Sequence, residues 1–240
     1  MRVTSIHREY HENMGIPINY IEIDYRFINH GQAMEKIIET YSKQIEYFIF
    51  LDNDALILEP NGPEIIYEKL KDGETVFGGA QNSNHINVNP THPFVQAATF
   101  CISRSLYNRL GKPRLSDGVY PRSDTCEEVT WLCQEKGFNV CMVWPRHYNE
   151  LTDEECSSSG NPKSWNLMGK TRYGLGTTYG NIFFHSGMQS LPRSAVVFEE
   201  KVKEILNPKI EAVTVCVNQS DFLRETLKFN RRHFDNFVVI

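Results

Sequence analysis

Short apolar runs alternate with amphipathic stretches along the chain, and this pattern predicts strands alternating with helices. Residues 18–23 alternate apolar and polar side chains, and residues 32–44 repeat apolar side chains at helical spacing. Tyr47–Leu51 is an unbroken run of aromatic and aliphatic residues, typical of a buried strand. The same criteria predict helices over 63–70, 104–110 and 127–136, and strands over 75–77, 96–103 and 139–144. This order favours an α/β fold with a mainly parallel central sheet and helices on both faces.

The two ends of the chain carry patterns that complement each other. Residues 212–240 predict a strand–helix–strand unit, and Arg2–Ser5 reads as the end of a strand. Joining the ends would give one continuous β-α-β-α-β half of a nucleotide-binding fold, and the termini of compact domains often lie close together. We therefore expect residues 1–240 to form a single domain in circularly permuted order, its first β-α-β unit supplied by residues 212–240. Two alternatives remain, in which this segment begins a second, truncated domain or swaps into the partner subunit of a homodimer.

Residues 145–180 predict a different kind of structure. They are rich in Gly, Ser, Asn and Thr and show little periodicity. Such stretches usually form loops, so we expect a mobile loop or lid here.

Two carboxylates, Asp52 and Asp54, directly follow the Tyr47–Leu51 strand. In an extended chain the side chains of residues i and i+2 point to the same side, so both carboxylates can face one ligand. Carboxylate oxygens suit Mg²⁺ or Mn²⁺, which often share their coordination shell with substrate phosphates. The ordinary explanation of a sequence such as Asp52-Asn53-Asp54 is a turn exposed to solvent. Apolar residues resume at once over Ala55–Leu58, however, and three polar residues between two buried stretches favour a site for a metal and phosphate.

Composition limits which partners and which cellular compartment are expected. The 240 residues carry a net charge of −5 at pH 7, so nucleic acid is not favoured as a partner, although a nucleic-acid acceptor stays open. No apolar run approaches the ~20 residues of a membrane span, and no secretory leader opens the sequence. The 6 cysteines follow no metal-binding spacing and read as reduced thiols. We expect a cytoplasmic protein without a membrane span.

These motifs resemble those of glycosyltransferases with the GT-A fold, in particular family 2. The run Phe48–Asp54 resembles the family's D-x-D segment, and Asn29–Ala33 resembles its N-x-G-x-A segment. Val213–Leu227 resembles the family's first strand and helix, which are N-terminal in those enzymes. The resemblance covers most of the chain in permuted order. It implies a Rossmann-like nucleotide-diphospho-sugar transferase fold.

The resemblance also implies where a nucleotide sugar and a metal bind. Asp52, Asn53 and Asp54 would hold the diphosphate and a Mn²⁺ or Mg²⁺ ion, with His185 as a further metal ligand. An ordinary histidine at a strand end is the alternative for His185. The remaining donor-binding residues implied are Asn29, Gly31 and Gln32 near the nucleotide, and Val215, Val217 and Asn218 at the base.

The acidic segment before the 127–136 helix resembles the one that supplies the family's catalytic base. There a carboxylate deprotonates the acceptor hydroxyl. Glu128 matches that role best, with Glu127 and Asp124 as alternatives. The Glu-Glu pair and its short spacing to Gly137 depart from the family pattern. Acids at a helix N-terminus also complement the helix dipole, so a purely structural role is the alternative to a catalytic one for these acids.

The function implied is a metal-dependent transfer of a sugar, with inversion, from a nucleotide diphosphate donor, expected to be UDP-linked. The acceptor is a saccharide or another hydroxyl compound, and Gln81 and Gln96 fall in the regions expected to face donor sugar and acceptor. Retention stays open, because Leu51–Leu58 also resembles retaining GT-A families. The alternatives of another class are a nucleotidyltransferase and a non-catalytic nucleotide-sugar-binding module.

Overall fold

The computed structural model describes most of the chain as two compact units, Met1–Glu199 and Glu200–Ile240, which are taken separately. The described residues are 2–16, 29–41, 45–83, 92–116, 124–155, 175–187, 191–206, 211–214 and 236–239. The predicted strand over 18–23, the predicted helix within 212–240 and the base-site residues Val215, Val217 and Asn218 lie outside the described residues.

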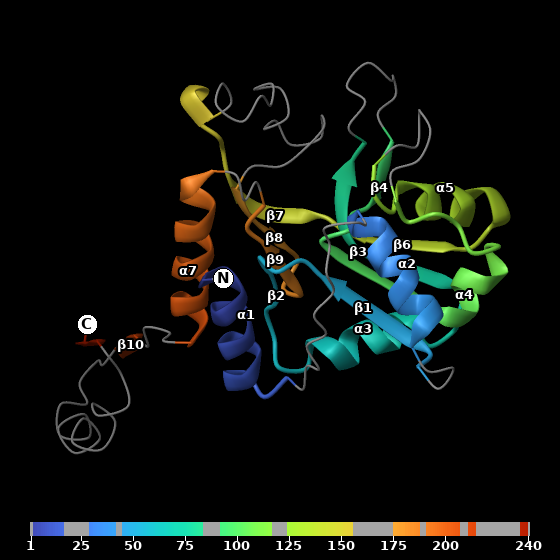
Figure 1. Cartoon of the computed structure of the whole chain (residues 1–240). Coiled ribbons are helices and arrows are strands. Elements are labelled where there is room, and N and C mark those ends of the chain that lie inside the picture. The colour runs from blue at the N-terminus through green and yellow to red at the C-terminus, as the bar shows by residue number, and fades with distance from the viewer. Residues whose placement is uncertain are drawn as a thin grey trace. The chain divides into compact units, whose positions relative to one another are not determined.

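The first unit combines helices and strands, as the alternating pattern predicts (Figure 1). Its helices are α1 (Arg2–Asn13), α2 (His30–Thr40), α3 (Gly62–Leu70), α4 (Arg104–Arg109), α5 (Glu127–Lys136) and α7 (Pro192–Leu206), which continues past the boundary of the unit. Its strands are β1 (Tyr47–Leu51), β2 (Ala55–Ile57), β3 (Thr75–Asn82), β4 (Pro93–Val95), β5 (Thr99–Ser103), β6 (Asn139–Val143), β7 (Pro145–Asn149), β8 (Leu175–Tyr179) and β9 (Phe183–His185). Among the described residues, no helix is both long enough and apolar enough to cross a membrane.

The strands form two sheets, and their pairing corrects the expectation of a mainly parallel sheet. The 5-stranded sheet has the order β1-β5-β3-β4, with β6 paired to β3. Only the β3–β6 pair is parallel among the described pairings of this sheet, and the 4-stranded sheet β2-β9-β8-β7 is antiparallel. The reason lies in the connection after β3. Residues 83–92 join β3 to β4, and this connection is shorter than the dozen or so residues that a parallel crossover needs. β4 and β5 then both run antiparallel to β3, with Val95 opposite Ala80 and Cys101 opposite Phe77, and the strand predicted over 96–103 is interrupted at Ala97 and Ala98.

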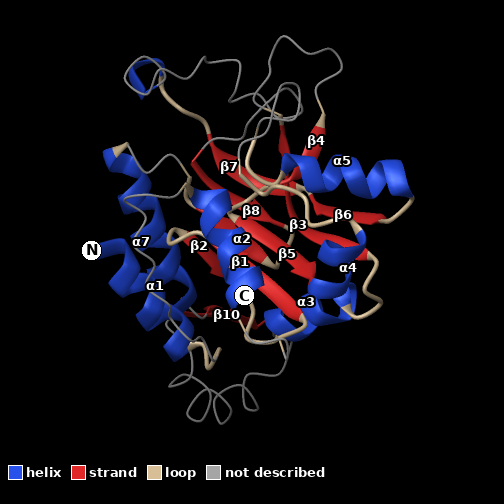
Figure 2. Ribbon diagram, turned by 45° about the vertical axis from the view of Figure 1, so that its right-hand side comes forward, coloured by secondary structure: helices blue, strands red, loops and turns tan. Residues whose placement is uncertain are grey.

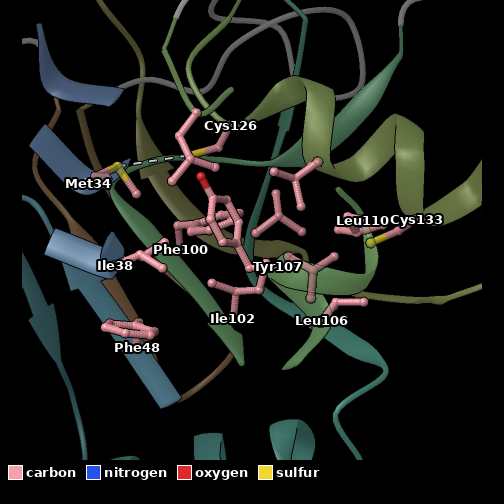
Figure 3. Close-up of a cluster of buried hydrophobic side chains, with 14 residues drawn as sticks. Met34, Ile38, Phe48, Phe100, Ile102, Leu106, Tyr107, Leu110, Cys126 and Cys133 are labelled. Atoms are coloured by element: carbon pink, nitrogen blue, oxygen red, sulfur yellow. Dashed lines mark hydrogen bonds between the residues drawn. The ribbon is translucent and has the colours of Figure 1, made fainter. Parts of the chain in front are cut away.

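Helices cover both faces of the 5-stranded sheet because apolar side chains alternate along its strands. On β5, Phe100 and Ile102 enter a core cluster with α2, α4 and α5, whereas Cys101 between them enters a second cluster with α3. Figure 3 shows the first cluster, and Figure 2 shows α2 and α4 in front of β1 and β5. The buried helix residues of the first cluster are Met34, Ile38, Leu106, Tyr107, Val129 and Cys133, and Leu110 joins them from the C-cap of α4. Period-two patterning of the strands therefore builds two hydrophobic layers around one sheet.

Phe100 is the position where we expect the largest loss of core stability. Its side chain is fully buried and its ring centroid lies 6.4 Å from that of Phe50. Phe100→Ala is expected to lower the free energy of unfolding by about 3–5 kcal/mol, because the cavity adds to the lost apolar burial. Urea unfolding followed by circular dichroism measures this loss. Phe100→Leu should lose less, and Tyr67→Ala, at an exposed position on α3, is the control. A loss no greater than that of Tyr67→Ala would contradict the assignment of Phe100 to the core.

Two strands are present where the sequence predicts a loop over 145–180. β7 and β8 pair antiparallel, with Pro145 opposite Tyr179 and irregular register between them. β7 carries few apolar residues and lies largely exposed, and β8 owes its burial to glycine and threonine as much as to apolar side chains. Neither strand shows the period-two apolar signal on which the prediction depended. Residues 156–174 of this stretch lie outside the described residues.

The second unit contains β10 (Glu211–Thr214) and β11 (Asn236–Val239). They pair in parallel as a 2-stranded sheet of their own, with Glu211 opposite Asn236. Strands are thus present where the sequence predicts them at both ends of the 212–240 segment, and the permuted single domain stays a prediction. Residues 2–5, predicted as a strand end, instead form the first turn of α1, and this one strand assignment is corrected.

Candidate metal centre

Asp52, Asn53 and Asp54 form the turn between β1 and β2, where the chain leaves the 5-stranded sheet and enters the 4-stranded one. The backbone N–H of Asp52 donates to the carbonyl of Ala98 at 3.1 Å. The N–H of Ala55 donates back to the carbonyl of Asp52 at 2.9 Å and closes the turn. Both anchors are backbone groups, so the two hydrogen bonds use neither carboxylate.

Strand pairing brings His185 to this turn from the far end of the first unit. β9 pairs antiparallel with β2, and His185 lies opposite Ala55 in that register. The Nε2 atom of His185 lies 3.5 Å from Oδ1 of Asp54 and 3.9 Å from Oδ2 of Asp52. One ligand atom from each of Asp52, Asp54 and His185 lies within 4.8 Å of the others. The three residues that sequence reasoning named as metal ligands therefore converge.

This cluster can hold a divalent cation. Asp54 is the most enclosed member, with 3% of its side chain exposed, against 18% for His185 and 29% for Asp52. Two carboxylates this close repel each other, and a cation between them offsets that repulsion. Carboxylates with one imidazole form a donor set for first-row divalent metals.

The segment His185–Gly187 is built to hold Asp54. The backbone N–H of Gly187 donates to Oδ2 of Asp54 at 2.9 Å, and the N–H of Ser186 donates to the Asp54 carbonyl at 2.9 Å. Gly187 has φ +68°, a left-handed conformation that favours glycine. Ser194 at the start of α7 donates its hydroxyl to the Gly187 carbonyl at 2.6 Å. This accounts for a glycine two residues after the histidine.

Asp52 has a second histidine neighbour that sequence reasoning missed. Nε2 of His30, at the first position of α2, lies 3.2 Å from Oδ1 of Asp52. Burial raises the pKa of Asp52, His30 and His185 oppose this rise, and the charge of Asp54 adds to it. The sequence held one signal for His30, its place directly after Asn29 in the segment that resembles N-x-G-x-A.

The three donor-binding residues predicted in that segment have structural roles at the start of α2. Asn29 and Gln32 form a reciprocal capping box, with side chain to backbone distances of 2.9 and 3.0 Å. Gly31 packs so tightly that an added Cβ would lie 2.2 Å from the backbone nitrogen of Ser116. Contact of these residues with a nucleotide stays a prediction.

A polar pocket of about 190 Å³ adjoins the cluster. Its lining includes Phe94 of β4 and, at the turn between β4 and β5, Ala97 and Ala98. Gln81 and Gln96, expected to face donor sugar and acceptor, both line it. The titratable lining residues are His30, Asp52, Asp124 and His185.

Of the three acids predicted as catalytic base, Asp124 lines this pocket, while Glu127 and Glu128 are not among its described lining residues. Glu128 is half-buried on the first turn of α5. Consecutive helix residues are rotated by about 100°, so the side chains of this Glu-Glu pair point in different directions. Asp124 lies in the turn that precedes the helix. Cys126 in the same turn has φ 70°, and the backbone N–H of Cys126 donates to the Leu115 carbonyl at 2.9 Å.

Glu127 is a buried structural carboxylate. It is fully buried and accepts hydrogen bonds from the Ser83 hydroxyl at 3.2 Å, the Asp124 backbone N–H at 3.1 Å and the Trp131 indole at 3.4 Å. Burial by itself raises the pKa of Glu127, but the His92 imidazole, whose Nδ1 lies 3.7 Å from Oε1, and these hydrogen-bond donors outweigh it, and the net pKa is lowered. Its carboxylate thus fixes the turn that presents Asp124.

Two buried histidines of α1 lie behind β2. The Nε2 atom of His11 accepts from the Ile57 backbone N–H at 3.4 Å, so its Nδ1 carries the hydrogen and donates to the His7 carbonyl at 3.0 Å. Burial lowers the pKa of His11 below 6.5, and burial and the neighbouring His11 lower that of His7 to about 4. Both side chains are therefore neutral near pH 7.

Protonation of these histidines is expected to destabilise the fold as the pH falls. Below about pH 6.5 the unfolded chain binds protons that the folded His11 does not, so the free energy of unfolding decreases toward pH 5. For His7, whose pKa is about 4, this decrease amounts to up to about 2 kcal/mol between pH 7 and 5, and His11 adds to it in the same direction. Urea midpoints across this range should fall less steeply for His11→Leu than for wild type, with exposed His147→Leu as control. The raised pKa of Asp52 acts in the opposite direction and is common to all three proteins. Equal slopes for His11→Leu and wild type would contradict the expectation.

Comparison with known proteins assigns no family. The chain matches no protein-family model, and no curated protein matches it either. Function is therefore inferred from the chemistry of the site.

Proposed function

We propose that this protein is a metal-dependent glycosyltransferase that moves a sugar from a nucleoside-diphosphate donor, a UDP-sugar, to an acceptor hydroxyl. The convergence of Asp52, Asp54 and His185, beside a polar pocket that Asp52 and His185 line, carries the proposal. The same pocket contains a further carboxylate, Asp124. A cation site beside a separate carboxylate meets the two requirements of the reaction, stabilisation of a diphosphate leaving group and removal of a proton from the acceptor.

The donor set fits the metal that the proposal requires. Asp52, Asp54 and His185 would hold it, and the imidazole favours Mn²⁺ over Mg²⁺, which prefers an all-oxygen shell. When bound, such a cation neutralises charge that develops on the diphosphate as the sugar leaves. Asp54 is held by the Gly187 N–H, so the chain presents this ligand without a change of conformation.

Other pocket residues would handle the sugar and the acceptor. Asp124 would accept the proton of the acceptor hydroxyl, consistent with attack on the anomeric carbon and inversion. Gln81, which is partly exposed, offers an amide donor and acceptor to sugar hydroxyls, whereas Gln96 and Phe94 are buried in the wall of the pocket. The pocket of about 190 Å³ is smaller than the roughly 300–1,000 Å³ of most small-molecule sites, so the described residues enclose one portion of the donor.

Two measurements on the full chain test the proposal. Calorimetric titration of UDP in the presence of Mn²⁺ is expected to show binding that is lost when EDTA removes the metal. A UDP-release assay over a panel of UDP-sugars and saccharide acceptors is expected to identify the donor, and proton NMR of the product gives the anomeric configuration. UDP binding without release for any donor would indicate a nucleotide-sugar-binding module. Absence of nucleotide binding would reject both the transferase and the module.

A further inference from the structure

The two carboxylates of the cluster are held in the same way. Asp54 turns Oδ1 toward His185, 3.5 Å from Nε2, while its Oδ2 accepts the backbone N–H of Gly187 at 2.9 Å. Asp52 turns Oδ2 toward His185, 3.9 Å from Nε2, while Nε2 of His30 lies 3.2 Å from its Oδ1. Each carboxylate thus directs one oxygen into the cluster and has its other oxygen against a nitrogen of the protein.

We propose that His30 is a positioning residue that orients Asp52 as a metal ligand. The inference rests on the proposed metal centre and deepens it. Asp52 lies in a turn with 29% of its side chain exposed, so burial alone does not fix its carboxylate. The imidazole nitrogen of His30, 3.2 Å from Oδ1, restricts rotation of the carboxylate and leaves Oδ2 directed at the cluster. Partners of this kind in the outer shell of a metal site typically change metal affinity by about 10–100-fold.

His30 is suited to this role because the start of α2 is itself held rigidly. The capping box of Asn29 and Gln32 fixes the first turn of the helix. Glu35, one turn further on, accepts the backbone N–H groups of Leu115 at 2.6 Å and Ser116 at 3.0 Å. Gly31 allows the same 115–116 backbone to lie directly against the helix. The segment that resembles N-x-G-x-A therefore holds His30 in a fixed position.

A surface ion pair without a role is the competing explanation. The side chain of His30 is 42% exposed, and exposed pairs of this kind contribute little to stability. Stability measurements therefore do not distinguish the two explanations. Metal affinity does, because only a positioning role changes the binding of Mn²⁺.

The test is a titration of the full chain with Mn²⁺ alone, in which electron paramagnetic resonance measures the free ion. His30→Leu keeps the bulk of the side chain and removes its donor, and we expect Mn²⁺ to bind about tenfold more weakly. His30→Gln carries an amide nitrogen at similar reach and should restore most of the affinity. Asp54→Ala should remove binding at this site. His147→Leu, at an exposed position on β7, should bind as wild type does.

The outcomes separate this inference from the proposed function. Equal Mn²⁺ affinity in His30→Leu and wild type, with loss of binding in Asp54→Ala, would overturn the role of His30 and leave the metal centre in place. Absence of Mn²⁺ binding by wild type would overturn both. Matching circular dichroism spectra and melting temperatures for His30→Leu and wild type exclude misfolding as the cause of weaker binding.

Discussion

Replacement of Asp54 by alanine is expected to abolish metal-dependent sugar transfer, with a fall in kcat/KM of at least about 10³-fold. Asp54 is the most buried carboxylate of the cluster, and its Oδ1 lies 3.5 Å from Nε2 of His185. Its loss removes a ligand that no other described residue of the cluster can replace. The expected size follows from several kcal/mol of transition-state stabilisation supplied by the metal, at a factor of ten in rate for each ~1.4 kcal/mol.

The Asp54 experiment needs a control for its structural role, since its Oδ2 accepts the Gly187 N–H. Asp54→Asn keeps an oxygen for that hydrogen bond and removes the charge, so it should fold as wild type does and still fail to bind Mn²⁺. Glu64→Ala removes an exposed acid on α3 and should leave transfer unchanged. The measurements are UDP release at saturating Mn²⁺ and the Mn²⁺ dissociation constant. Transfer retained by Asp54→Asn would contradict the metal assignment.

Asp124→Asn is expected to lower kcat by about 10²–10⁴-fold while UDP and Mn²⁺ still bind, because a general base contributes to the chemical step. Asp124 lines the pocket, and its turn is fixed by the bond from its own N–H to Glu127 at 3.1 Å. Asparagine preserves the shape of the side chain and removes only its basicity. The acidic limb of the pH dependence of kcat should disappear in this variant.

A comparison along α5 shows which acid is the base. Glu135→Gln changes an exposed acid of the same helix and should keep wild-type kcat. A larger loss in Glu128→Gln than in Asp124→Asn would assign the base to Glu128, the residue that the family resemblance favours. Weaker UDP binding in Asp124→Asn, with unchanged kcat at saturation, would instead make Asp124 a donor-binding residue.

Local patterns in the sequence predicted several elements with their observed bounds. β1 at Tyr47–Leu51 and α5 at Glu127–Lys136 agree at both ends. β1 is an unbroken apolar run, and α5 ends at Gly137, whose φ of 74° suits glycine at a helix C-terminus. Such signals depend only on neighbours in the chain. β7 and β8 lacked them, and their place is decided by pairing with each other and with β9.

The sequence by itself determined the acidic turn and the chemistry that its carboxylates can support. It also indicated His185, through an apolar strand that ends in a histidine. Only the tertiary structure decided that His185 reaches the turn, because the β2–β9 register joins residues more than a hundred positions apart. The same holds for His30 beside Asp52, and for Asp124 in the pocket while Glu127 is buried. These distinctions depend on which face of a helix or turn meets the site, and packing of distant segments sets that orientation.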